Sequence, residues 1–470
     1  MIEAKFFTNN KNVLVVGAGR SGLAALRLLA RQGCRLAVSD GGPLHRLAAE
    51  QQQWLHDKQV VMEFDGHRTE TFCRVHCIVV SPGVPLELPQ LAAARQRGIP
   101  VISELELGAL FTDVDIVAVT GTNGKTTVTT MIGAMLSADG KRVFVGGNIG
   151  TPLCDFVARQ EEADVLVLEV SSFQLDSCAS FRPHVAVLLN ISPDHLDRYA
   201  SYAAYADAKM QIFRRQRRHD FAVINGDDTE IAGRLSAIPS TIRKFGRQKS
   251  CQARMVGNTA LVQLPGEGQE EYPLPEEIST YPNSDNCLAA ILVARLMACG
   301  AEAVEQGLAD FRCLEHRLRT VAIIRGVTYI DDSKATNIGA LQSALAGMTG
   351  PVHLIAGGRD KGGDYCLASG DVSRRVKSLI LMGEAADKMA AAWGEYVRVM
   401  RAASLEEAVN LAAEQAQGGE VVLLSPACAS FDMFSSYSER GRVFQEAVAA
   451  LEADDRQSEA GLHMAAQAGT

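Results

Sequence analysis

Residues 117–128 read VAVTGTNGKTTV, in which an apolar run leads into a glycine-rich loop and a lysine. The run is typical of a buried strand, and apolar positions from Val128 to Leu136 then recur at helical spacing. Backbone N–H groups at a helix N-terminus can surround a phosphate, and the helix dipole favours its negative charge. We therefore expect strand, phosphate loop and helix, with Lys125 reaching the terminal phosphates of ATP or GTP and Thr126 binding Mg²⁺.

The loop departs from the common phosphate-loop pattern, which places a glycine where this chain has Val119. It is the shorter GTNGKT form, and the alternative is an ordinary glycine-rich turn between a strand and a helix. Lysine followed by a hydroxyl residue favours the phosphate site, because turn geometry needs neither residue.

Apolar runs alternate with helical patterns along the chain, which indicates an α/β fold with parallel sheets covered on both faces. The expected strands are 13–16, 36–39, 78–80, 116–119, 165–168, 185–189, 222–224, 353–355, 378–381 and 421–424. A length of 470 residues suggests about three domains. Boundaries near Ser103 and Cys313 predict a Rossmann-like domain over 1–103, a P-loop-type ATPase domain over 104–313 and a Rossmann-like α/β domain over 314–470.

Two segments depart from this alternation. Residues 252–272 combine β-type runs with turns and predict a small antiparallel excursion, after which helices are expected over 284–297 and 303–311. The polar, alanine-rich tail from about Ala453 predicts disorder.

The first domain contains NVLVVGAGRSG, which places Gly17, Gly19 and Gly22 as GxGxxG directly after a strand. Asp40 follows the next strand, as in dinucleotide-binding domains, and could accept ribose hydroxyls. A UDP-linked ligand satisfies the same physics as NAD, and a Rossmann-like domain without a nucleotide is the alternative. A second loop, 81–83, ends another strand at the same edge of the sheet.

Composition excludes several classes of protein. A net charge of −9 argues against nucleic acid or an anionic membrane as the main partner, and the basic run 214–218 is expected to be a solvated helix face. No apolar run approaches the roughly 20 residues of a membrane span, and no signal peptide is recognised, so we expect a cytoplasmic protein. The eleven cysteines are scattered singly, which predicts thiols rather than disulfides or a zinc site.

Chemistry-bearing residues follow the strands of the second domain. Glu169 ends the strand of DVLVLEV, where a carboxylate beside a phosphate loop favours Mg²⁺. His195 also lies beyond a strand, although a single histidine is as often structural as functional. Asn148 could donate to a phosphate or carbonyl. Lys209 reads as an ordinary surface lysine from its helical context alone.

Together these segments resemble the Mur ligase family of ATP-dependent amide ligases over nearly the whole chain. The markers are GTNGKTT, LEVSSFQL, NISPDHLDRY, NSDN at 283–286, EHRLR at 315–319, DDSKATN at 331–337 and SPACASFDMF at 425–434. The last two motifs resemble the member that adds D-glutamate. The resemblance implies that ATP phosphorylates the carboxylate of UDP-N-acetylmuramoyl-L-alanine and that the amine of D-glutamate displaces phosphate, in peptidoglycan synthesis.

The resemblance also assigns roles to residues. Two Mg²⁺ ions are implied, with metal ligands Thr126, Glu169, His195 and Lys209, the last carbamylated by CO₂; Lys125, His195 and Lys209 are the implied catalytic residues. ATP contacts are implied for Gly121, Thr122, Asn123, Gly124, Lys125, Thr126, Thr127, Asn283, Asn286, Arg317 and Asp332. The UDP-substrate is implied to lie against Ser21, Asp40, Gly83 and Asn148, and D-glutamate against Lys334, Thr336, Lys361, Ser430 and Phe431.

Four positions depart from the family pattern: Pro282 replaces a histidine, Gly41 and Gly42 replace larger polar residues, and Tyr437 stands where phenylalanine is frequent. They affect expected nucleobase contacts rather than the chemistry. We expect a monomer. The alternatives are another amino-acid ligase of the superfamily, an NAD-dependent oxidoreductase fused to an NTPase, and a nucleotide-gated binding module that hydrolyses ATP slowly.

Overall fold

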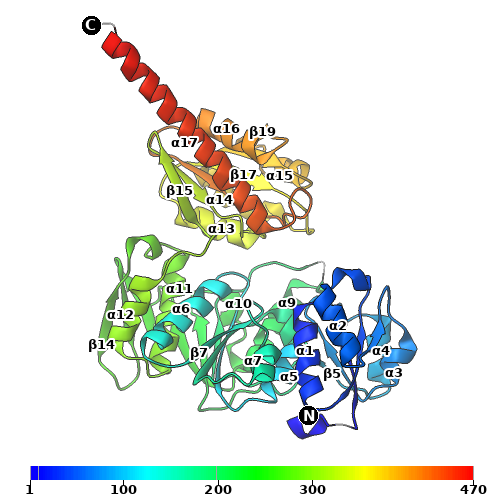
Figure 1. Ribbon diagram of the computed structural model, residues 1–470. Coiled ribbons are helices and arrows are strands. Elements are labelled where there is room, and N and C mark those ends of the chain that lie inside the picture. The colour runs from blue at the N-terminus through cyan, green and yellow to red at the C-terminus, as the bar shows by residue number, and fades with distance from the viewer. Residues whose placement is uncertain (1, 9, 197, 469–470) are drawn as a thin grey trace. The chain divides into compact units, whose positions relative to one another are not determined.

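A computed structural model describes residues 2–8, 10–196 and 198–468, with side chains described through Arg456. The chain divides into two compact units. The first comprises Met1–Ile191, Ala203–Pro273 and Asn286–Phe311, and the second Ser192–Tyr202, Leu274–Asp285 and Arg312–Thr470. The first unit carries two β-sheets and the second carries one (Figure 1).

The first sheet has five parallel strands in the order β3-β2-β1-β4-β5. They are β1 Asn12–Val16, β2 Arg35–Ser39, β3 Val61–Glu63, β4 Cys77–Val80 and β5 Val101–Ser103. Val16 pairs with both Ser39 and Val80, so the loops after β1, β2 and β4 leave one edge of the sheet together. The strand order reverses beside β1, and ligands of open α/β sheets bind at such a point.

The second sheet has nine strands in the order β14-β13-β12-β11-β10-β9-β6-β8-β7. They are β6 Asp115–Thr120, β7 Val143–Gly147, β8 Val165–Glu169, β9 Val185–Leu188, β10 Phe221–Asn225, β11 Thr241–Phe245, β12 Ala253–Val256, β13 Thr259–Gln263 and β14 Gln269–Pro273. Only the β12–β13 and β13–β14 pairs are antiparallel, which confirms the expected excursion. Glu169 pairs with Val119 and with Gly147, so three strands end beside the phosphate loop.

The second unit contains a six-stranded sheet in the order β15-β16-β20-β17-β18-β19, in which only β15 is antiparallel to its neighbour. The strands are β15 Arg319–Ile324, β16 Val327–Asp331, β17 Val352–Gly357, β18 Val376–Met382, β19 Arg398–Arg401 and β20 Val421–Leu424. Asp331 pairs with Leu424, which in turn pairs with Ile355, so the loops after these strands leave one edge.

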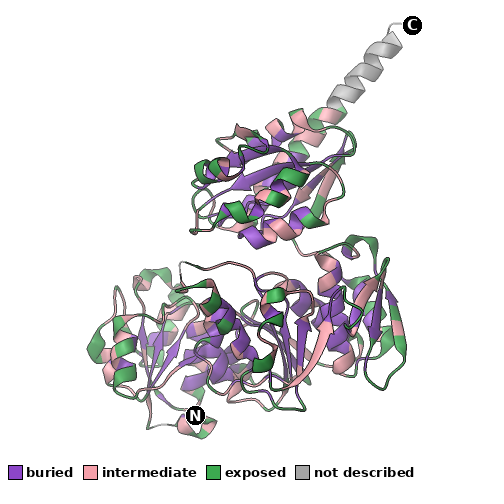
Figure 2. Ribbon diagram, turned by 180° about the vertical axis from the view of Figure 1, so that it is seen from behind, coloured by how far each residue is buried: buried purple, intermediate pink, exposed green. Residues whose placement is uncertain are grey.

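Helices cover the faces of these sheets, and most strands are buried (Figure 2). They are α1 Arg20–Arg31, α2 Ala49–Asp57, α3 Thr69–Cys73, α4 Pro89–Gln96, α5 Glu104–Ala109, α6 Lys125–Ala138, α7 Leu153–Arg159, α8 Ser172–Leu175, α9 Tyr202–Met210, α10 Thr229–Ala232, α11 Asn283–Leu296, α12 Ala301–Asp310, α13 Ile338–Gly347, α14 Ser369–Arg375, α15 Ala386–Trp393, α16 Leu405–Gln415 and α17 Tyr437–Ala468. Among the described residues, no helix is both long and apolar enough to cross a membrane.

The α/β fold class is confirmed, and each expected strand is present. Strands β3, β5, β11, β15, β16 and β19 were not predicted from the sequence, because they are short or more polar than the others. The basic run 214–218 was wrongly expected to be a helix face: its arginines are exposed, but they lie in turns between α9 and β10. Helix α17 is assigned over Tyr437–Ala468 and so enters the tail from Ala453, for which the expected disorder stays a prediction. Residues 469–470 lie outside the described residues.

Candidate active site

The phosphate loop connects β6 to the N-terminus of α6, as the sequence predicts. Gly124 caps α6 with φ = +85°, and a Cβ there would lie 2.5 Å from Oδ1 of Asn286, so glycine is required. Asn190 fixes the loop: its backbone carbonyl accepts from the N–H of Thr122 at 3.0 Å, and its Oδ1 accepts from the N–H of Asn123 at 2.9 Å. The loop is thus shaped before any ligand binds, with the first amides of α6 at its end.

Glu169 lies beside this loop and is buried, with 3% of its surface exposed. Thr126 Oγ1 donates to Glu169 Oε2 at 2.7 Å, and Asn148 Nδ2 donates to Glu169 Oε1 at 2.8 Å. Mg²⁺ prefers oxygen ligands and commonly binds one or two carboxylates together with substrate phosphates and water. The hydroxyl and carboxylate fit such an ion. Among the described residues, no three His, Cys, Asp or Glu side chains cluster as a metal site.

Two lysines meet at one carbonyl of the loop. Lys125 Nζ donates to the carbonyls of Gly121 and Thr122, both at 2.9 Å, and Lys209 Nζ donates to the same Gly121 carbonyl at 2.8 Å. Lys209 is only 2% exposed and its Nζ lies 4.6 Å from the centroid of the Tyr205 ring. The interpretation of Lys209 as a surface lysine is therefore wrong, because α9 turns this residue inward. The Lys125 ammonium group therefore lies beside the loop, where its positive charge suits phosphate.

A pocket of about 520 Å³ lies at the edge of the first sheet where the loops after β1, β2 and β4 converge. The four residues expected to contact the UDP-substrate all line it, namely Ser21, Asp40, Gly83 and Asn148. Arg20 and His67 line it too and were missed. Arg20 stands within the GxGxxG motif itself, whereas no motif marked His67.

Asp40 holds two backbone turns of this pocket together. Its Oδ2 accepts from the N–H of Ala18 at 2.6 Å and its Oδ1 accepts from the N–H of Gly42 at 2.7 Å. The carboxylate therefore ties the glycine-rich turn after β1 to the turn after β2. Each oxygen keeps a second lone pair, so contact with a ribose stays a prediction.

In the second unit, a pocket brings together His195, Thr336 and Lys361, which come from distant parts of the sequence. Asp194 lies at its centre: its Oδ2 accepts from Asn337 Nδ2 at 2.9 Å, and Oδ1 lies 3.9 Å from Lys361 Nζ. His195 Nε2 lies 3.7 Å from Asp194 Oδ2. Asp194 was not predicted, although it stands next to His195 in the NISPDH motif. His195 and Lys209 belong to different units, so their shared role as metal ligands stays a prediction.

Asp332 lies at the sheet edge of the second unit and is buried. Burial raises the pKa of its carboxyl to about 8, although Ser425 Oγ donates to it at 3.0 Å. Nearby, Lys334 Nζ lies 3.8 Å from the centroid of the Tyr437 ring. Since tyrosine and phenylalanine both present such a ring face, this sequence departure leaves the contact intact.

The remaining predicted residues of the second unit differ in exposure. Ser430 is buried, Arg317 is half-buried, and Phe431 is 65% exposed. Asn283 Nδ2 lies 4.0 Å from Cys313 Sγ. Their roles toward ligands stay predictions.

Arg440 is a further residue that the sequence analysis missed. Its guanidinium is 2% exposed, donates to Oγ and the carbonyl of Ser333 at 3.0 and 2.8 Å, and donates to the Cys428 carbonyl at 3.1 Å. Desolvation lowers its pKa to about 10. Arg440 thus joins the DDSKATN and SPACAS loops, although it lies outside both motifs.

Family models match three consecutive parts of the chain: the Mur ligase MurD-like N-terminal domain over residues 11–103, the Mur ligase middle domain over 119–294 and the Mur ligase glutamate ligase domain over 316–428. A UDP-N-acetylmuramoylalanine–D-glutamate ligase of Geobacter metallireducens is 43% identical over 95% of this chain and 99% of its own length. The chain belongs to the Mur ligase family. The ligase of the same name from Desulfosudis oleivorans is 44% identical over 95% of this chain and 98% of its own length.

Solved Mur ligases share the fold of this Mur ligase. A MurF ligase of Thermotoga maritima in complex with ADP aligns with a TM-score of 0.59 at 16% identity, over 96% of this chain and 97% of that one. The UDP-N-acetylmuramate–alanine ligase MurC of the same organism aligns with a TM-score of 0.55 at 18% identity, over 94% and 100%. At such identities the likeness concerns the fold alone.

Proposed function

We propose that this Mur ligase uses ATP to join D-glutamate to UDP-N-acetylmuramoyl-L-alanine, releasing ADP and phosphate, in peptidoglycan synthesis. The observation that carries the proposal is 43% identity over 95% of the chain to a ligase of that name. The hydrogen bond from the half-buried Thr126 to the buried Glu169 beside the phosphate loop supports ATP chemistry.

The reaction needs activation, because a carboxylate is a poor electrophile. Transfer of the terminal phosphoryl group of ATP to the alanine carboxylate forms an acyl phosphate, which supplies a leaving group. The D-glutamate amine then attacks the carbonyl carbon, phosphate leaves, and the amine loses a proton. The α6 amides and Lys125 stabilise the negative charge on the phosphates during transfer.

Thr126 and Glu169 would hold one Mg²⁺, which would neutralise phosphate charge. We further propose that Lys209 is carbamylated: its amine adds CO₂ and loses a proton, so that a cation becomes a carboxylate-like ligand. Support comes from the burial of Lys209 beside the phosphate loop. His195 is proposed as a ligand of the second ion.

D-glutamate carries two carboxylates, which suit cationic side chains. We propose that Lys334, Thr336 and Lys361 bind them, with Ser430 and Phe431 beside the amino acid. The Asp194–Lys361 and Asp194–Asn337 contacts support this assignment, because they hold Lys361 and the turn after Thr336 in one pocket.

The deciding experiment measures phosphate release from ATP with UDP-N-acetylmuramoyl-L-alanine and one of D-glutamate, L-glutamate, L-lysine, meso-diaminopimelate or L-alanine, with mass detection of the product. Turnover with D-glutamate alone is expected. Turnover with another amino acid would retain the ligase chemistry and overturn the assigned substrate. Phosphate release without an amide product would instead favour the nucleotide-gated module.

A further inference from the structure

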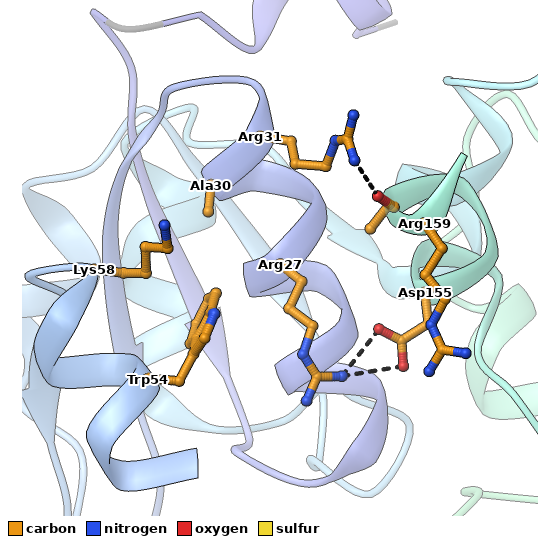
Figure 3. A pocket seen from close by; sticks show the side chains of 8 residues that line it. Arg27, Ala30, Arg31, Trp54, Lys58, Asp155 and Arg159 are labelled. Carbon is orange, nitrogen blue, oxygen red and sulfur yellow. Dashed lines mark hydrogen bonds and ion pairs between the residues drawn. The ribbon is translucent and has the colours of Figure 1, made fainter. Parts of the chain in front are cut away.

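A second pocket of the first unit, of about 380 Å³, lies between α1, α2 and α7 (Figure 3). Its lining includes Arg27 and Arg31 of α1 and Arg159 of α7, all at or near the C-terminal ends of their helices. The pocket assigned to the UDP-substrate borders the other end of α1. The 12 residues of α1 separate the two ends by about 18 Å. The α1–α2–α7 pocket is therefore distinct from that site.

The pocket gathers positive charge in a chain whose net charge is −9. Its lining holds four cationic side chains, Arg27, Arg31, Lys58 and Arg159, and one carboxylate, that of Asp155, which leaves a formal charge of +3. Arg27 Nη1 already donates to both oxygens of the buried Asp155, at 3.0 and 3.2 Å. Because Arg27 and Asp155 neutralise each other, the remaining formal charge of the lining lies on Arg31, Lys58 and Arg159.

Those three cations retain donors for a ligand. Arg31 donates one hydrogen bond, at 2.7 Å, to the Ala158 carbonyl. Arg159 Nη1 lies 3.5 Å from Glu161 Oε1, which is a long ion pair. Within the described part of the chain, the side chain of Lys58 makes no hydrogen bond or ion pair. Cations near helix C-termini interact favourably with the helix dipole, which accounts for their presence at these helix ends but not for their lining one pocket.

Trp54 of α2 adds a flat apolar wall. Its indole is half-buried and projects into the pocket from the same helix end as Lys58, while α7 forms the opposite wall beyond α1 (Figure 3). An aromatic ring stacks on indole, and an anionic group on that ring can reach guanidinium and ammonium donors. The lining therefore offers one apolar and one cationic subsite side by side.

We propose that the α1–α2–α7 pocket binds a small aromatic anion, such as an aryl phosphate, with the ring on Trp54 and the anionic group on Arg31, Lys58 and Arg159. Because its walls come from both α1 and α7, an occupant contacts residues on both sides of the expected domain boundary near Ser103. The proposal is independent of the reaction assigned above.

The test uses tryptophan fluorescence, because the chain contains only Trp54 and Trp393. In a Trp393→Phe variant, titration with phenyl phosphate is expected to change Trp54 fluorescence saturably, with ADP and the UDP-substrate present to fill the other sites. Calorimetry on the unsubstituted protein provides a second measurement that does not depend on the variant. Phenol and inorganic phosphate, which each supply one half of the ligand, are expected to bind at least about 10-fold more weakly.

Lys58→Gln and Arg159→Gln are each expected to weaken phenyl phosphate binding about 10-fold, because each removes a charged donor. Arg97→Gln is the matched control, since Arg97 is exposed at the C-terminal end of α4 and is expected to leave binding unchanged. No saturable signal by either method, displacement by ADP or the UDP-substrate, or equal effects of the Lys58 and Arg97 variants would overturn the proposal. If inorganic phosphate bound as tightly as phenyl phosphate, the proposal that Trp54 forms an aromatic subsite would be overturned.

Discussion

Lys125 and Lys209 both donate to the carbonyl of Gly121, yet replacing each lysine is expected to affect the enzyme activity in a different way. Lys125 begins α6 and is proposed to contact the phosphates of ATP directly. Lys125→Ala is expected to lower kcat/KM by about 10²–10³-fold, the cost of losing one donor at developing charge. Phosphate release measures this loss, with an unchanged thermal midpoint as the control. Activity within a few-fold of the unsubstituted enzyme would contradict the phosphate-loop assignment.

Lys209→Ala tests the proposed carbamate. The variant is expected to be inactive, and acetate or formate is expected to restore part of the activity, because a short carboxylate can occupy the vacated metal-ligand position. Lys125→Ala is the matched comparison, since carboxylates cannot replace a cation and should not restore it. A folded Lys209→Ala protein that no carboxylate rescues would argue for a purely structural amine.

At the scale of elements, a buried hydrogen-bonded network joins β17, β18 and β20. His353 Nδ1 lies 2.7 Å from Ser378 Oγ, and Nε2 lies 2.8 Å from Glu420 Oε2, to which it donates because an ionised carboxylate can only accept. Burial raises the pKa of Glu420, but hydrogen bonds from His353 and Lys377 outweigh it and lower the pKa to about 2. These residues lie at or next to the N-terminal ends of β17, β18 and β20, at the sheet edge opposite the DDSKATN loop.

The folded pKa of Glu420 lies below the ordinary value of 4.5, so its contribution to stability is complete above that value. It is lost as pH falls from about 5 toward 2. Glu420→Gln is expected to cost about 1–3 kcal/mol at pH 7, and the difference from the unsubstituted protein should shrink as pH falls toward 3. Thermal midpoints across pH 3–7 measure this. A difference independent of pH would mean that the charge is not what stabilises the network.

Helix α17 packs on the third sheet through Phe444 and Val448, both fully buried. Phe444→Ala is expected to destabilise the second unit by about 3–5 kcal/mol, because it leaves a cavity in the core. Arg442→Ala, on the exposed face of the same helix, should cost only a few tenths of a kcal/mol through its pair with Glu446. Chemical denaturation of both variants compares these effects, and similar losses would contradict the packing of α17.

At the scale of the whole molecule, the predicted site residues fall in both units: the phosphate loop in the first, and Thr336 and Lys361 in the second. Ligands that contact both sets are expected to favour a closed arrangement, which would exclude water from an acyl phosphate. Small-angle scattering should therefore give a smaller radius of gyration with an ATP analogue and the UDP-substrate together than with either alone. Superimposable curves would contradict closure.

The sequence by itself determined the strands and turns that carry chemistry. Runs such as 117–119 and 165–168 are apolar throughout, because strands buried on both faces tolerate little else, and glycines mark turns such as Gly124 that need positive φ. Pocket residues such as Ser21, Asp40 and Gly83, which follow β1, β2 and β4, were predictable too, since ligands bind where parallel strands end. Edge strands such as β3 stayed hidden because three residues carry too little pattern.

Only the tertiary structure decided the burial and the contacts of polar residues whose neighbours come from distant segments of the sequence. Lys209 looks like a surface lysine locally, yet α9 buries it against a loop 88 residues away in sequence. Arg440 joins two loops that no spacing rule connects to it, and Trp54 and Arg159 line one pocket built from three helices. Local periodicity records which face of an element is apolar. It does not record which polar side chains meet across elements, because that depends on how the elements pack.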